Sequence, residues 1–317
     1  MQTREVGADR RHRLGQFPVA LVTQFVLVSP SKDRRQYSRT NKNDTGREAL
    51  PGVRFMVGRS RIRLVLALLT LMIFSGPAFA VDGCPTSKNE IATDRPDVTN
   101  SSLVVQTGSF QSENGINFSG RNGATVFDGT NSRLRLGVAH CLEVLIDVPD
   151  YFAVLSGEEN SGATDVTPAI KWQVSPVPGK LDLSIVAGAA LPTGTPRVAG
   201  RGTQPYLQFP WSWELGAGWA LNGMDTAFFF PSDPDNKLVV ETTFSLEKKV
   251  GEHADLFVEY VGDYPDHGPG LLMLNSGGAY RLTKTEQIDF HVAFGLSEAA
   301  PTYIVGLGYS FRVDGLF

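Results

Sequence analysis

The chain has 317 residues, a formal net charge of −4 and a hydrophobic content of 42%. The charge is uneven, because residues 81–317 hold 15 of the 29 basic side chains but 28 of the 33 acidic ones. An acidic body without a basic patch argues against nucleic acid as a partner. The hydrophobic content and the 33 glycines argue against intrinsic disorder, so we expect this part of the chain to be folded.

Residues 56–80 have the layout of a secretory signal peptide. Three arginines precede an apolar run, and the segment ends in Ala-Phe-Ala. The run is shorter than the roughly 20 residues that span a bilayer as a helix. We therefore predict export with cleavage after Ala80 and a translation start at Met56. Residues 1–55 are then a non-native N-terminal extension, with an organellar transit sequence as the alternative.

Residues 81–107 show no strand pattern. The stretch Thr93-Asp94-Arg95-Pro96-Asp97 is too rich in proline and charge for a central strand. We predict that residues 81–107 form a periplasmic N-terminal arm and that residues 108–317 form the main domain.

From residue 108 onward, apolar and polar side chains alternate with the period of two that is typical of β-strands. The last strand begins at Tyr303 and alternates strictly to Arg312, and the chain ends on the aromatic Phe317. A terminal aromatic strand is common in outer-membrane barrels, where the last strand pairs with the first and leaves no edge in lipid. The twelve strands predicted are 108–121, 131–139, 141–149, 164–174, 181–191, 204–215, 217–230, 238–247, 254–264, 271–282, 286–296 and 303 onward.

The connections between these strands alternate in length, as expected for long extracellular loops and short periplasmic turns. The long ones are predicted at 122–130, 150–163, 192–203, 231–237 and 265–270. One face of the strand at 204–215 carries a row of large side chains that suits lipid better than water: Leu207, Phe209, Trp211, Trp213 and Leu215. The pattern predicts an all-β, antiparallel, up-and-down transmembrane β-barrel of about twelve strands, and a soluble periplasmic β-rich binding protein is the alternative.

Three short motifs resemble a known family: Thr93 to Thr99, the hairpin Arg133 to Val144, and Leu191-Pro192-Thr193-Gly194. The chain resembles, over residues 91–317, the outer-membrane transporters of the phenol meta-cleavage degradation pathway. The resemblance implies passive transport of a small hydrophobic or aromatic solute across the outer membrane of a Gram-negative bacterium. The pair His140-Cys141 departs from the family pattern, which has a polar turn pair at this place.

The register of the second hairpin predicts which charges face the lumen. If residues 139–141 form the turn, Val138 pairs with Leu142, Leu136 with Val144 and Leu134 with Ile146. Opposed charges then meet on the inward face, Arg133 directly across from Asp147 and Arg135 diagonally from Glu143. The candidate solute-binding residues of the lumen are Arg133, Arg135, Glu143, Asp147 and His291. A purely structural ion pair between Arg133 and Asp147 is the alternative.

An inward histidine also leaves open a barrel enzyme that acts on lipids. Ser310 on the neighbouring strand and Asp289 could complete a triad with His291. A histidine in a polar lumen needs no catalytic role, so we expect no enzyme. The sequence has neither metal-ligand spacing of Cys and His nor a glycine-rich phosphate loop, and we expect no cofactor or metal.

The two cysteines, Cys84 and Cys141, are both expected on the periplasmic side, in an oxidising compartment. A disulfide between them is one alternative, since nothing in the sequence fixes their distance. The expected partners are outer-membrane lipid, the barrel-assembly machinery and the solute. The sequence leaves the oligomeric state open.

Overall fold

The computed structural model describes residues 90–317, apart from residues 122, 156–160, 175–180, 197, 201 and 234–235. The predicted extension, the predicted signal peptide and Cys84 lie outside the described residues. Within them, no helix is long and apolar enough to cross a membrane.

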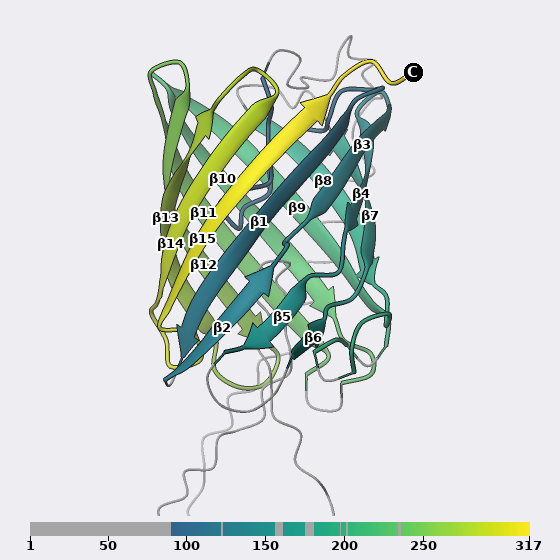
Figure 1. Ribbon diagram of the computed structural model, residues 1–317, viewed down its shortest axis with the longest axis vertical. Helices are drawn as coiled ribbons and strands as arrows, with labels where there is room; N and C mark the ends of the chain where they lie inside the picture. The colour runs from purple at the N-terminus through teal and green to yellow at the C-terminus, as the bar shows by residue number, and fades with distance from the viewer. Residues whose placement is uncertain are drawn as a thin grey trace, which may run out of the picture. The chain divides into compact units, whose positions relative to one another are not determined.

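The strands of the described chain form one closed antiparallel sheet (Figure 1). β15 pairs with β1 from Phe110↔Val313 to Gly120↔Tyr303, so the sheet has no free edge there. The strand segments are β1 (Phe110–Arg121), β2 (Ala124–Gly129), β3 (Arg133–Ala139), β4 (Leu142–Asp147), β5 (Tyr151–Val154), β6 (Ser161–Ala163), β7 (Thr167–Val174), β8 (Leu181–Ala190), β9 (Gln204–Gly216), β10 (Trp219–Phe229), β11 (Leu238–Val250), β12 (Ala254–Pro265), β13 (Leu271–Arg281), β14 (Glu286–Gly295) and β15 (Tyr303–Val313).

Three strands of the barrel wall are interrupted, so the fifteen segments make twelve wall strands. β2 and β3 pair with different halves of β1, while β5 pairs with β2 and β4 pairs with β3. β6 and β7 continue this arrangement against β5 and β4. The predicted twelve-stranded antiparallel barrel is therefore confirmed. The loops predicted at 122–130 and 150–163 are wrong in part, because they contain β2, β5 and β6, which are too short to show a clear alternation.

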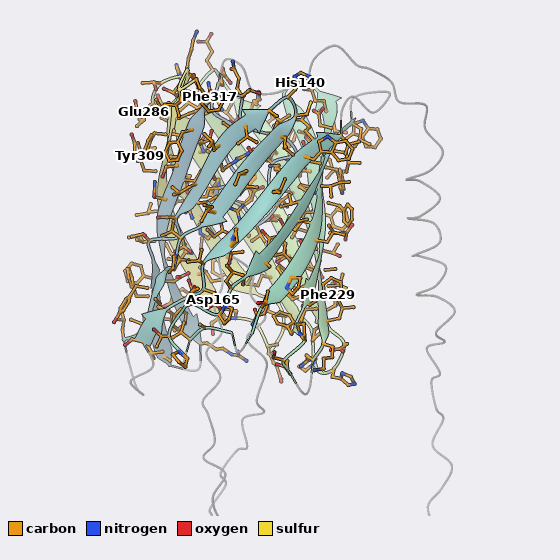
Figure 2. All side chains as sticks on the ribbon, turned by 90° about the vertical axis from the view of Figure 1, so that its right-hand side faces the viewer. His140, Asp165, Phe229, Glu286, Tyr309 and Phe317 are labelled. Atoms are coloured by element: carbon orange, nitrogen blue, oxygen red, sulfur yellow. The ribbon has the colours of Figure 1, made fainter. Side chains whose placement is uncertain are left out.

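Large apolar side chains cover the outer face of the wall, as the alternation predicts (Figure 2). Trp213 and Leu307 are 51% and 55% exposed, whereas Glu143 and His291 on inward-facing positions are fully buried. Exposing this much apolar surface is unfavourable in water and favourable in lipid. The wall therefore has the polarity of a transmembrane barrel, with an apolar outside and a polar inside.

The two ends of the barrel differ in their connections. His140, Glu286 and Phe317 lie at one end and Asp165 and Phe229 at the other (Figure 2). The first end carries the tight turns, such as those between β3 and β4 and between β9 and β10, so we assign it to the periplasm.

The chain end differs from the prediction that Phe317 closes the last strand. β15 ends at Val313, and Phe317 is 76% exposed beyond it. Leu316 N donates to the carbonyl of Gly108 at 2.7 Å, so the tail lies beside the start of the barrel instead of extending the ladder.

The second hairpin has nearly the predicted register. Leu134 pairs with Ile146, Leu136 with Val144 and Arg133 with Asp147, as predicted. The predicted pair of Val138 with Leu142 is wrong, because a register shift between Gly137 and Ala139 places Ala139 opposite Leu142. The turn is therefore formed by His140 and Cys141, and Cys141 has a φ of 59°.

Candidate functional site

Residues 90–107, which we call the plug, lie inside the barrel. Ile91 N donates to the carbonyl of Lys284, in the periplasmic turn between β13 and β14, at 2.8 Å. At its other end, Thr107 forms a parallel bridge with Gly137 of β3. Between these points the chain runs through the interior of the barrel, as the dark-blue trace before β1 shows (Figure 1). The expectation of an arm in the periplasm is therefore wrong for residues 90–107.

The plug stays in the lumen because the wall supplies partners for its backbone, which forms no sheet of its own. Glu143 of β4 accepts from Val105 N at 2.6 Å, and Gln173 of β7 accepts from Val104 N at 3.1 Å. A Cβ on Gly137 would collide with the backbone of Gln106, so a glycine is needed where plug and wall meet.

Arg135 of β3 is the centre of a buried ionic network. Its guanidinium lies 2.9 Å from Glu113, 2.9 Å from Glu143 and 3.3 Å from Asp94 of the plug. Burial raises the pKa of Asp94, but the charges of Arg135, Lys171 and Arg133 outweigh it and hold that pKa below its ordinary value. Asp94 is therefore ionised in the lumen and attracted to the wall.

Arg133 connects the plug to the pair predicted from the sequence. Its Nε lies 2.7 Å from Asp147 Oδ1, and its Nη1 lies 3.0 Å from Asp94 Oδ2. The same Nη1 donates to Asn100 Oδ1 at 3.0 Å. Arg133 therefore joins two positions of the plug to β4.

On the far side of the lumen, Glu259 of β12 receives the tip of the plug. Its carboxylate accepts from Val98 N at 2.9 Å and from both the backbone N–H and the hydroxyl of Thr99, each at 2.7 Å. The Thr99 hydroxyl also lies 2.6 Å from that of Thr243 on β11. Charge-assisted hydrogen bonds of this kind are stronger than neutral ones, so Glu259 anchors the tip.

The conceivable catalytic triad is not formed. His291 lies 3.2 Å from Asn275 Oδ1 and 3.1 Å from Asn117 Oδ1, through its two ring nitrogens. It pairs with Gly306 on β15, so Ser310 is about 13 Å away along that strand. Asp289 instead accepts from Arg95 of the plug at 3.2 Å. The triad was suggested because Ser310 lies on the strand next to that of His291. The register of the two strands places the two residues far apart.

The structure places all five predicted lumen residues on the inner side of the wall. Arg133, Arg135 and Glu143 contact the plug directly, and Asp147 does so through Arg133. His291 is one step removed, since Asn275 also donates to Glu259 at 2.9 Å. Sequence reasoning missed Glu259, Lys171 and Arg95. The alternation in the sequence places Glu259 and Lys171 on the inward face. No pattern in the sequence indicated a plug that these side chains would bind.

Two clusters of buried apolar side chains lie toward the extracellular end of the lumen, beside buried polar side chains such as Gln208, Glu241 and Asp263. One buried cluster joins the plug tip to β10 and β12–β15: Val98, Met224, Val261, Leu271, Met273, Ala293, Ala299, Ala300 and Ile304. A second lies on β4 and β7–β11: Leu145, Ala169, Val186, Tyr206, Phe228, Phe230 and Val239. The lumen toward the outside of the cell is therefore mixed, with two apolar clusters beside buried polar side chains, and it is strongly charged around the plug.

A cavity lies between the plug tip and the wall, with about 490 Å³ of empty volume, part of it open to solvent. It is lined by Asp94, Arg95, Val98, Asn100, Glu113, Asn131, Ser132, Arg133, Asp147, Asp150, Gln208, Met224 and Glu241. Within the described part of the chain, no group of three or more His, Cys, Asp or Glu side chains is arranged to hold a metal ion. Cys141 is disulfide-bonded.

Comparison with solved structures identifies outer-membrane barrels. The COG4313 outer membrane channel from Pseudomonas putida F1 is 14% identical, with a TM-score of 0.53 over 66% of this chain and 97% of that one. The NanC porin is 6% identical, with a TM-score of 0.47 over 64% of this chain and 100% of that one. The CymD monoaromatic hydrocarbon channel is 13% identical, with a TM-score of 0.39 over 67% of this chain and 90% of that one. None of the curated proteins matches the sequence significantly.

The fold and the apolar wall are those of a protein of the Gram-negative outer membrane. A family described as "Putative MetA-pathway of phenol degradation" matches residues 93–313, which include the plug from Thr93 onward and every strand of the barrel. The chain belongs to this family.

Proposed function

We propose that this barrel carries a small hydrophobic or aromatic solute across the outer membrane by passive transport. The observation that carries the proposal is the pair of buried apolar clusters toward the extracellular end of the lumen, exemplified by Phe228, Val261 and Met273. The family's link to phenol degradation and the fold shared with an outer membrane channel support the same class of function.

In this proposal the plug keeps polar solutes and ions out, and it must shift before a solute can reach the periplasm. It is held by charges and hydrogen bonds from most sides of the wall, including Glu143, Glu259 and Asp289. No nucleotide motif occurs in the sequence, so any active transport would need another protein. Catalysis is disfavoured because both nitrogens of His291 lie against amide oxygens.

Outer-membrane lipid and the assembly machinery remain proposed partners. Exposed side chains such as Trp172 and Phe290 suit lipid contact. The C-terminal strand is where an assembly machine would bind a barrel before it closes.

Uptake in whole cells tests the transport proposal. Cells that produce the full chain should accumulate radiolabelled toluene faster than cells without it, while uptake of a sugar of similar size should not change. Equal toluene uptake in the two strains would contradict the proposal.

A further inference from the structure

One charged side chain faces outward in the middle of the barrel wall. Asp225 of β10 is exposed, whereas its neighbours Met224 and Thr226 point into the lumen and are each 1% exposed. Two further charged residues, Lys248 and Glu286, occupy outward positions of the described wall strands, and both lie near periplasmic strand ends. Among these outward positions, Asp225 is therefore the one charged residue that lies away from the strand ends.

The depth of Asp225 places its carboxyl group against hydrocarbon. β10 spans Trp219–Phe229, so Asp225 lies six residues from the periplasmic end of the strand and four from its extracellular end. At about 3.3 Å per residue and a strand tilt of about 40°, these separations are about 15 Å and about 10 Å along the membrane normal. A carboxyl group at this depth is unfavourable unless hydrogen-bond partners surround it.

The described residues supply a partner for one oxygen of this carboxyl group. The Thr242 hydroxyl on β11 donates to Asp225 Oδ1 at 2.8 Å, and Oδ2 has no partner within the described part of the chain. Lipid chains contain no hydrogen-bond donor. A donor from another protein molecule in the membrane would satisfy the second oxygen.

The same outer surface holds a hydroxyl that lacks an acceptor. The hydroxyl oxygens of Tyr260 and Tyr264 on β12 are 2.7 Å apart, and both lie over Gly262. One of these hydroxyls donates to the other, so the pair retains one hydroxyl hydrogen without an acceptor among the described residues. Each copy of the chain therefore has one carboxyl oxygen that needs a donor and one hydroxyl that needs an acceptor.

The position of these two groups allows a symmetric contact. Thr242 pairs with Asp225 on one side and with Gly262 on the other, so the tyrosine hydroxyls lie about 10 Å from Asp225 across the wall. β12 ends at Pro265, which places Gly262 about 8 Å from the extracellular end, close to the depth of Asp225. A two-fold axis along the membrane normal preserves depth and exchanges the two sides, so it brings Asp225 of each copy to the tyrosine pair of the other.

We propose that the outward face of β10–β12 is a self-association surface, on which two copies of this chain form a dimer with Asp225 of each copy hydrogen-bonded to the Tyr260–Tyr264 pair of the other. Small side chains allow close contact of protein surfaces in lipid, and Ala227 and Gly262 supply them here. A hydroxyl suits an ionised or a protonated carboxyl group, because it both donates and accepts. The inference goes beyond the proposed transport and does not depend on the solute.

Disulfide cross-linking tests which face makes the contact. Cys141 is disulfide-bonded and Cys84 is its expected partner, so a cysteine added to the full chain is the free thiol. Val240 faces outward on β11, near the proposed axis, and Val240→Cys barrels in lipid vesicles should give a cross-linked dimer on oxidation. Val305→Cys is the matched control, because Val305 also faces outward two residues from the extracellular end of its strand, on β15, and it should stay monomeric.

Sedimentation equilibrium in detergent tests which side chains hold the dimer. Asp225→Leu, and separately the double variant Tyr260→Phe, Tyr264→Phe, should each raise the dissociation constant of the dimer about tenfold, because each removes two symmetry-related hydrogen bonds. Tyr303→Phe changes an outward tyrosine on β15 and should leave the constant as in the wild type. Heat-modifiable gel mobility shows whether each variant is folded.

The result that supports the inference is a dimer that cross-links through Val240→Cys alone and is weakened by both sets of substitutions. A wild-type barrel that is monomeric at every concentration would overturn it. Equal cross-linking of the two cysteine variants, or a dissociation constant unchanged in Asp225→Leu and in the double tyrosine variant, would overturn it as well.

Discussion

Asp94 of the plug and Arg135 of β3 form a buried ion pair in the lumen, with 3.3 Å between Asp94 Oδ1 and Arg135 Nη1. The same guanidinium neutralises Glu113 and Glu143. A residue that the sequence suggested as a solute contact is thus also an anchor of the plug. Substitution of Arg135 should therefore first change the fraction of barrels in which the plug is bound in the lumen.

Arg135→Met should loosen the plug and raise the ion conductance of the barrel in planar bilayers. The substitution keeps an extended side chain but removes the cation that Glu113 contacts, and it leaves Asp94 and Glu143 with Arg133 and Lys171. Breaking a buried pair in this way costs about 3–5 kcal/mol. Lys249→Met, at an exposed position near the periplasmic end of β11, is the control and should conduct as the wild type does. Wild-type conductance in folded Arg135→Met would show that this residue does not hold the plug.

Asp97 should make docking of the plug depend on pH. Burial, with Glu259 and Glu247 nearby, raises the pKa of Asp97 well above its ordinary value. The docked plug therefore binds this proton more tightly than the released plug, so docking weakens as pH rises from the ordinary value toward the raised one.

Asp97→Asn removes this titration and should flatten the rise of conductance with pH. Single-channel recordings of the wild type and the variant across the same pH range provide the measurement. A parallel rise in both proteins would assign the pH dependence to other groups.

The sequence predicted those parts of the fold that produce a periodic pattern. Alternating residues such as Leu134 and Leu136 identified wall strands, and register alone paired Arg133 with Asp147. Pattern could not find the plug, because a segment that takes its hydrogen bonds from side chains such as Glu259 has no period of its own. The plug was marked in the sequence only by its composition, through the acidic and basic residues around Pro96.

Two other differences have local causes. The breaks in three wall strands near Gly129, Pro149 and Asp165 shorten the alternating segments below a recognisable length. The separation of Ser310 from His291 follows from antiparallel register, which sequence distance does not reveal.

Cys84 is expected to be the partner of Cys141. Cys141 is disulfide-bonded at the β3–β4 turn, and the sequence contains two cysteines. Digestion without reduction should yield a linked peptide pair that contains both residues, and mass spectrometry would identify it. Maleimide labelling of either thiol in the unreduced, folded barrel would count against the pairing.

Deleting Phe317 should reduce the amount of barrel in the membrane and leave the flux per barrel similar. The residue lies beyond β15 and is largely exposed, so the folded wall does not depend on it, whereas an assembly machine could recognise it. Quantitative blotting of outer-membrane fractions, normalised against uptake, gives both quantities. Normal levels of the truncated protein would exclude an assembly role.

The account as a whole requires the plug to move when solute passes. Thr99 and Thr243 allow this to be controlled, because their hydroxyl oxygens lie 2.6 Å apart. Replacing both with cysteine puts two sulfur atoms in position for a disulfide between plug and wall. Cys84→Ser and Cys141→Ser in the background remove competing thiols.

Phenol flux into proteoliposomes, measured before and after reduction of the Thr99→Cys, Thr243→Cys barrel, tests the central claim most directly. We predict that the oxidised barrel blocks phenol, that reduction restores the flux, and that the cysteine-free background shows neither effect. Flux through the oxidised barrel equal to that of the background protein would contradict gating by the plug.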